Sequence, residues 1–135
     1  MATLTELREG LVDNLSKIPG LRVSTYTPDN PNPPMAIISP QSIEYHKAFK
    51  NGFSTYNFTI SVYVGRVSER SAQANLDAYC IPTGPYSIKN AIESDRTLSG
   101  RCFDLVVSDM RNYGSVIIGE NTYLTAEFDC AVQAN

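Results

Sequence analysis

The sequence contains little of what catalysis at a metal or nucleotide site usually needs. It has no tryptophan and a single histidine, His46, and its three cysteines form no CxxC pair. A metal site needs three or four converging His, Cys or carboxylate ligands, and no such spacing is present. P-loop, G-x-G-x-x-G and G-x-S-x-G motifs are missing as well. We therefore expect no cofactor and no metal, and the absences favour a structural or interaction protein over an enzyme.

Long apolar runs and excess positive charge are also missing. No apolar run approaches about 18 residues and no charged-then-apolar leader opens the chain, so we expect neither a membrane span nor a secretory signal. The net charge is −3. We therefore do not expect the protein to bind nucleic acid by neutralising its phosphates. Cys80, Cys102 and Cys130 are odd in number and widely spaced, so we expect three free, mostly buried thiols in a reducing cytosol.

What is present predicts one α+β domain over residues 1–135. Leucines spaced by three and four residues run from Leu4 to Ile18, and Thr3 with Glu6 forms a capping box. Further helices are predicted over residues 68–80 and 86–95. Strands are predicted over residues 21–26, 35–39, 102–110, 115–119 and 123–133, with turns at 111–114 and 119–122. Few helices packed on one face of a mostly antiparallel sheet define the α+β class.

The prolines are concentrated in one stretch. Five of the eight lie between Pro28 and Pro40, in or just after the sequence TPDNPNPP. Proline fixes φ and pushes the preceding residue toward extended conformations, and predicted strands flank the stretch. We expect residues 27–34 to form a stiff, non-helical surface crossover, and Pro40 to sit at an edge or a bulge. A PxxP ligand for another protein is the alternative interpretation.

A long, projecting hairpin is predicted over residues 35–64. The dipeptide Asn51-Gly52 favours a type I′ turn, because both residues tolerate positive φ. A two-residue loop there puts Tyr45 opposite Phe58, and the cross-strand pairs on that face are mostly apolar. Each arm is longer than a usual strand, so we expect the tip to project beyond the sheet.

Two groups of side chains are candidates for a functional surface. Large aromatic side chains beyond a small core are usually interface anchors, so we expect the hairpin arm to contact a neighbouring subunit or partner unless the first helix covers it. The residues of this group are Ile43, Tyr45, Lys47, Phe49, Lys50 and Phe53. Glu127 and Asp129 share one face of the last strand, about 7 Å apart by strand geometry. They form either an acidic solvent-facing or channel-facing pair, or a general acid/base pair.

The segments follow a recognisable order. An opening helix ends in NLSKIPGLRV, a proline-rich crossover YTPDNPNPPMAII leads into the hairpin, and VGRVSERSAQANLDAYC, GPYSIKNAIESDRTLSG and YGSVIIGENTYLTAEFDCAVQAN follow. This pattern resembles the tail terminator proteins of long-tailed, non-contractile bacteriophages. The likeness covers nearly the whole chain and is one of pattern and order, without a catalytic motif.

The resemblance implies a structural virion protein. In that family the protein forms a homo-hexameric ring that caps the tail tube, ends tube polymerisation and offers a surface for joining to the head. The implied partners are the tail tube protein and a head-closure or neck protein, while DNA passes through the ring without specific binding. The implied location is the head–tail junction of the virion, after assembly in the host cytoplasm.

Two other interpretations stay open at this point. Head-closure proteins, neck adaptors and tail-tube-like proteins share small mixed folds and ring symmetry, so the chain could be another component of the head–tail joint. A small cellular enzyme or binding domain is the third interpretation.

Overall fold

A computed structural model describes residues 3–25, 34–45, 54–66, 72–118 and 120–134. These residues form an α+β fold, as predicted. The helices are α1 (Leu4–Leu15), α2 (Ala72–Cys80) and α3 (Ile88–Ile92). The strands are β1 (Arg22–Ser24), β2 (Met35–Tyr45), β3 (Ser54–Arg66), β4 (Asp104–Ile118) and β5 (Asn121–Ala134).

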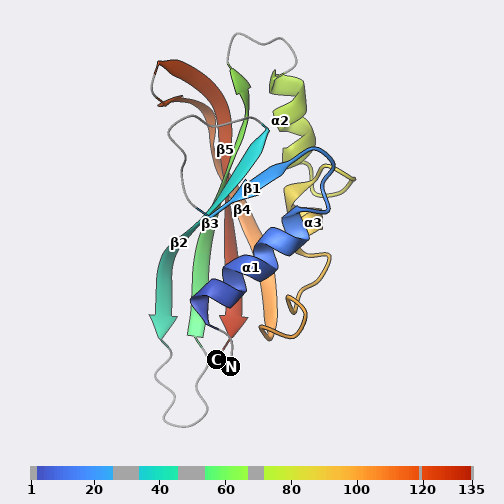
Figure 1. Ribbon diagram of the computed structural model, residues 1–135, viewed down its shortest axis with the longest axis vertical. Coiled ribbons are helices and arrows are strands. Elements are labelled where there is room, and N and C mark those ends of the chain that lie inside the picture. Colours follow the sequence, from blue (N-terminus) through green and yellow to red (C-terminus); the bar gives the residue numbers. More distant parts are fainter. Residues whose placement is uncertain (1–2, 26–33, 46–53, 67–71, 119, 135) are drawn as a thin grey trace.

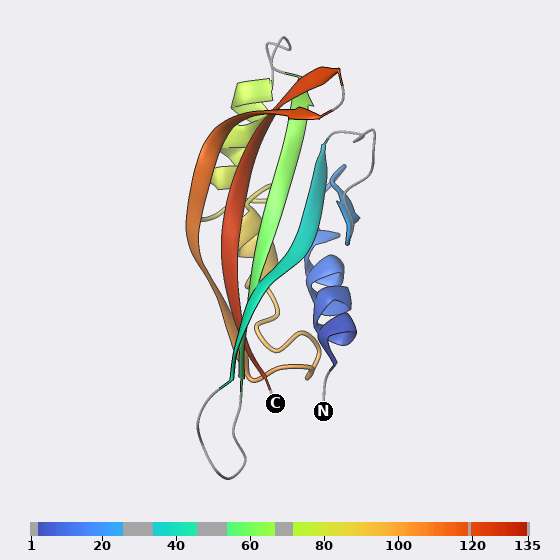
Figure 2. The same ribbon diagram turned by 90° about the vertical axis from the view of Figure 1, so that its left-hand side faces the viewer.

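The five strands form one sheet in the order β1-β2-β3-β5-β4. Only the β1–β2 pair is parallel, and the other three pairs are antiparallel. All three helices lie on the same side of the sheet (Figure 1). Figure 2 shows the sheet from the opposite side. We call the side without helices the open face. The sheet is therefore half covered by this chain's own described helices.

The first helix forms as its sequence predicts. The Thr3 hydroxyl accepts a hydrogen bond from the backbone N–H of Glu6 at 3.1 Å, which satisfies one of the free donors of the first turn. Leu7, Leu11 and Leu15 lie on one stripe and are fully buried. This stripe packs on the sheet and joins a single hydrophobic core.

A loop after α3 holds α1 in place. The side chain of Asn14 is buried and donates hydrogen bonds to the backbone oxygens of Ile92 and Asp95, at 2.9 and 3.1 Å. Leu98 adopts a left-handed φ of 50° and is buried against Gly10, where an added Cβ would lie 2.8 Å from the Leu98 Cβ. Glycine at position 10 is therefore required by the close approach of this loop to the helix.

Strand β5 divides its side chains between two environments. The predicted apolar set points into the core, and its members are buried except for the partly buried Leu124. This set consists of Leu124, Ala126, Phe128, Cys130 and Val132. The intervening residues face the open side, because successive side chains of a strand alternate between faces. The period-two prediction for this strand is confirmed.

The predicted register between the second and third strands is wrong. Tyr45 pairs with Ser54, and Phe58 pairs with Pro40. A turn dipeptide sets the register only if the ladder runs unbroken to it, whereas the observed pairing leaves residues 46–53 between the two strands. The displacement is four residues at Tyr45 and five at Phe58, because the ladder shifts by one residue between Pro40 and Ser42, and Phe58 is buried in the core. The Asn51-Gly52 turn and a projecting tip lie outside the described residues.

The proline at position 40 sits at an irregularity, as predicted. The ladder between β2 and β3 shifts between Pro40 and Ser42, and β1 pairs only with residues 35–37 of β2. Beyond residue 37 no described strand pairs with the outer side of β2, so Pro40 lies at a bulge on an edge, where proline is tolerated. The crossover predicted for residues 27–34 lies almost entirely outside the described residues.

The turn predicted at residues 111–114 is wrong. Strand β4 runs without interruption from Asp104 to Ile118 and pairs with β5 along its length. Two register shifts, between Val107 and Asp109 and between Arg111 and Gly114, accommodate the polar residues, and Asn112 adopts a φ of 56°. The turn-forming residues therefore make a bulge inside one long strand.

We expect Gly10→Ala to destabilise the protein, although alanine has the higher helix propensity. The new methyl group meets a Leu98 Cβ that its left-handed backbone holds in place, and overpacking of this kind typically costs about 1–3 kcal/mol. Urea unfolding of Gly114→Ala is the control, because a Cβ there meets no atom within 4 Å. An unchanged or higher midpoint for Gly10→Ala would contradict the close packing described here.

Candidate functional site on the open face and edges of the sheet

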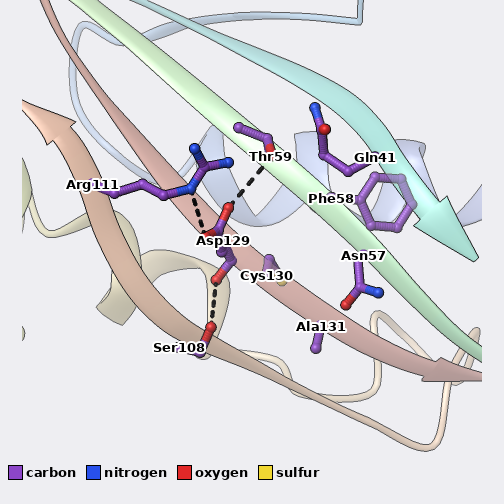
Figure 3. Close-up of a pocket in the computed structure, with 9 residues that line it drawn as sticks. All are labelled: Gln41, Asn57, Phe58, Thr59, Ser108, Arg111, Asp129, Cys130 and Ala131. Atoms are coloured by element: carbon purple, nitrogen blue, oxygen red, sulfur yellow. Dashed lines mark hydrogen bonds and ion pairs between the residues drawn. The ribbon is translucent and has the colours of Figure 1, made fainter. Parts of the chain in front are cut away.

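The open face presents polar side chains from three neighbouring strands. Asn57, Thr59 and Ser61 of β3 lie beside Glu127 and Asp129 of β5, as the register requires. Thr59 is only 2% exposed although it is on the uncovered side, and its hydroxyl points toward the Asp129 carboxylate. The face is thus a packed polar surface with carboxylates at its centre (Figure 3).

One arginine joins the two predicted carboxylates. The Arg111 Nε lies 2.8 Å from Asp129 Oδ2, and an Nη2 nitrogen of the same side chain lies 3.9 Å from Glu127 Oε2. The side-chain amide of Asn112 donates to Glu127 Oε1 at 2.7 Å. The hydrogen bond with Asp129, with the charges of nearby carboxylates, raises the pKa of Arg111 further above its usual range.

Glu127 and Asp129 share a face as predicted, but each has a donor of its own. Thr59 also donates to Asp129, at 3.5 Å. A general acid/base pair needs at least one group free to exchange a proton with substrate. The observed contacts instead hold the carboxylates in place and leave the cluster of Arg111, Glu127 and Asp129 with a net negative charge.

The sequence pattern did not indicate Arg111 as part of this cluster. It was assigned to a turn, whereas the bulged strand places it across from Glu127. The available signal was the cross-strand pairing of β4 with β5, which requires the register to be known first.

A shallow hollow of about 320 Å³ lies over this cluster (Figure 3). Its lining comes from all four long strands. The residues are Gln41, Asn57, Phe58, Thr59, Ser108, Arg111, Asp129, Cys130 and Ala131. Among the described residues, no group of three or more His, Cys, Asp or Glu side chains could hold a metal ion.

The predicted contact residues of the hairpin arm are only partly described. Ile43 is half-buried and Tyr45 is 76% exposed, at the end of β2. Lys47, Phe49, Lys50 and Phe53 lie outside the described residues, as does His46. The described part of the arm thus ends in a large exposed aromatic side chain.

The outer edge of β4 is closed by α3 near its start. Val107 turns its backbone N–H and C=O away from β5, and they are bound by the side chains of Lys89 in α3 and of Glu93, the C-cap residue of α3. Glu93 Oε2 accepts from the N–H at 2.9 Å, and Lys89 Nζ donates to the carbonyl at 3.1 Å. Lys89 and Glu93 also form a salt bridge of 2.5 Å. We call these two side chains the α3 clamp, and no strand can pair with Val107 while they stay bound.

The clamp perturbs the titration of Glu93. Burial by itself would raise the pKa of this carboxyl, but hydrogen bonds from Lys89 and Val107 and the charges of Lys89 and Arg96 outweigh it. The pKa of Glu93 is therefore lowered below its ordinary value. Sequence reasoning missed the clamp, although the i, i+4 spacing of Lys89 and Glu93 was a visible signal.

Beyond the clamp, β4 leaves apolar side chains exposed. Met110 is 41% exposed and Tyr113 is 39% exposed on the helix side, while Val106 is 40% exposed on the open face. The Tyr113 hydroxyl donates to Asp77 of α2 at 2.7 Å, which ties this part of the strand to the helix layer. An edge strand with large exposed apolar groups is a candidate contact surface.

The cysteines agree with the prediction of free thiols. Cys102 and Cys130 are buried and Cys80 is half-buried. Burial raises the pKa of Cys80 and Cys102 to about 11 and that of Cys130 to about 12. The thiolate is the reactive form, so these thiols should react slowly at neutral pH.

We expect Glu93→Gln to lower stability at neutral pH by about 1 kcal/mol, because Lys89 loses its counter-charge. A lowered folded-state pKa means that the contribution of Glu93 is present above the ordinary pKa and is lost as pH falls through the folded value. The difference in unfolding free energy from the parent should therefore be full above the ordinary glutamate pKa of about 4.3, and it should shrink as pH falls below that value. Glu9→Gln, at an exposed position of α1, is the control. A difference that is independent of pH would show that the clamp does not act through this charge.

Comparison with known proteins adds no assignment. None of the described helices is long and apolar enough to cross a membrane. No protein-family model matches the chain, and no curated protein matches it significantly.

Proposed function

We propose that this protein is a subunit of a tail-terminator ring in a long-tailed, non-contractile phage. Six copies form a ring that caps the tail tube, ends its polymerisation and presents a surface for joining to the head. Its partners are the tail tube protein and a head-closure or neck protein, and its place is the head–tail junction of the virion. Assembly takes place in the host cytoplasm.

The observation that carries the proposal is the composition of the open face. Around Glu127 and Asp129 it is polar, the side chains there are held by ion pairs and hydrogen bonds, and this central cluster has a net negative charge. The wall of a DNA channel must not grip phosphates, and fixed carboxylates repel them. We place the open face, with Glu127 and Asp129, toward the channel of the ring.

The edges of the sheet support a ring for a second reason. Heterologous contacts between identical subunits need two different surfaces on each copy. The sheet offers β4 on one edge, with Met110 and Tyr113 exposed, and the end of β2 on the other, with Tyr45 exposed. Contacts between two unlike edges leave the open face uncovered, as a channel wall requires.

Electron microscopy of the purified protein tests the proposal. We expect six-fold rings, alone or on the ends of tail tubes assembled from the tube protein of the same genome. Rings that bind connector-bearing heads but not tubes would identify a head-closure or neck protein instead. Absence of rings both alone and with tubes would contradict the proposal.

The channel placement gives a separate prediction. The parent protein should not bind double-stranded DNA measurably at physiological salt, whereas Glu127→Lys with Asp129→Lys should bind with an affinity that falls steeply as salt rises. Glu6→Lys with Glu9→Lys makes the same change of charge on α1, in the helix layer. Rings of this control should let DNA pass without retention, and equal retention by both variants would argue against a channel-facing sheet.

A further inference from the structure

A second carboxylate binds the outer edge of β4 next to the α3 clamp. The backbone N–H of Leu105 donates to Asp104 Oδ1 at 2.9 Å. Arg96 holds the same carboxylate twice, from Nε to Oδ1 at 2.7 Å and from Nη2 to Oδ2 at 3.1 Å. Arg96 Nη1 also lies 4.0 Å from Glu93 Oε1 of the clamp. One chain of alternating charges therefore runs along this edge. We call it the edge seal, and its members are Lys89, Glu93, Arg96 and Asp104.

The edge seal occupies the backbone groups that a further strand would use. Successive residues of a strand turn their N–H and C=O groups to opposite sides, so Leu105 and Val107 both face the outer edge. The seal binds the N–H of Leu105 and both the N–H and the C=O of Val107. A neighbouring strand would lie about 4.8 Å away, where the seal side chains are. Pairing therefore requires the seal to leave.

The edge seal is attached through side chains that reach into solvent. The side chains of Lys89, Arg96 and Asp104 are 38%, 50% and 53% exposed, and that of Glu93 is 18% exposed. Exposed ion pairs of this kind contribute little stability, because water competes for both partners. The seal can therefore open while the core beneath it stays folded.

The strand segment under the seal is complementary to itself. Residues 104–107 read DLVV and contain neither proline nor glycine. If two copies pair antiparallel about Val106, Leu105 of each copy lies opposite Val107 of the other, and their outward groups meet as hydrogen-bond partners. Val106 then lies opposite its own copy on a two-fold axis. Its side chain is 40% exposed on the open face, so the pairing buries an apolar cross-strand contact.

We infer that the edge seal holds β4 closed against a second copy of this chain, and that its release lets residues 104–107 of two copies pair antiparallel across a two-fold axis. The same surface of both copies is used, so the contact ends with a dimer and cannot propagate around a ring. The inference goes beyond the proposed ring and does not depend on it. In a ring-forming protein the seal would keep subunits out of a competing dimer.

A cysteine at the two-fold axis tests the pairing. Directly opposed residues of a non-hydrogen-bonded pair have Cα atoms about 4.5 Å apart, which a disulfide can span. Val106→Cys in the sealed parent should form little interchain disulfide under a mild oxidant. Adding Glu93→Ala and Asp104→Ala removes the two acceptors of the seal, and the disulfide yield should rise roughly tenfold as strand hydrogen bonds replace them.

Ile117→Cys is the matched control for collisions between exposed cysteines. Ile117 lies on the same strand and is 74% exposed, but it pairs with Thr122 near the far end of β4. Its disulfide yield should be the same with and without the seal. The parent without an added cysteine shows how much the native thiols contribute.

Sedimentation velocity of the full chain gives a second measurement. The variant without the seal should associate about tenfold more tightly than the parent. Adding Val106→Lys should restore the behaviour of the parent, because two like charges then oppose each other across the axis. Circular dichroism shows whether each variant is folded. If the double variant fails to fold, Glu93→Gln and Asp104→Asn keep the side-chain shapes, and each should raise the Val106→Cys disulfide yield above that of the sealed parent.

The outcomes separate this inference from the proposed function. Equal Val106→Cys disulfide yields with and without the seal, whether high or absent, overturn the inference. An equal rise at Ile117→Cys shows unselective association and overturns it as well. None of these results bears on six-fold rings, and a parent chain that forms no rings leaves the seal inference intact.

Discussion

The two-residue period of β5 is the constraint on which both the core and the candidate site depend. The strand lies between β3 and β4, so its register determines what faces each neighbour. One set of its side chains, including Phe128 and Cys130, is buried beneath the helices. The alternate set, including Glu127 and Asp129, must then lie on the open face. A shift by one residue would bury both carboxylates, so the hydrophobic core fixes the position of the acidic cluster.

Much of the fold could be predicted because it follows from local patterns. The Thr3 cap, the buried stripe of α1 and the alternation of β5 depend on residues close together in sequence. The register of β2 against β3 depends on the path of the chain between them, and Asn51-Gly52 alone did not determine it. Bulges and turns are both rich in polar residues and glycine. The segment from Arg111 to Gly114 was therefore predicted to be a turn, although it forms a bulge within β4.

The candidate site could be predicted only where one strand supplies it. The shared face of Glu127 and Asp129 follows from their spacing, while Arg111 reaches them only through strand pairing. The α3 clamp is likewise invisible in a linear pattern, because Lys89 and Glu93 bind the backbone of a strand that follows later in the chain. The partners of such side chains can be assigned only once the tertiary arrangement of the elements is known.

Two features at the edges of the sheet restrict its pairing with further strands. Exposed strand edges invite unselective pairing, and here the two edges are restricted by different devices. Pro40 removes a donor from β2 at a bulge, and the α3 clamp binds the outward groups of Val107 on β4. Both devices suppress backbone pairing while leaving Tyr45 and Met110 exposed. Any contact through these edges would then depend on side-chain fit and charge, which select one partner and one orientation in a way that backbone pairing does not.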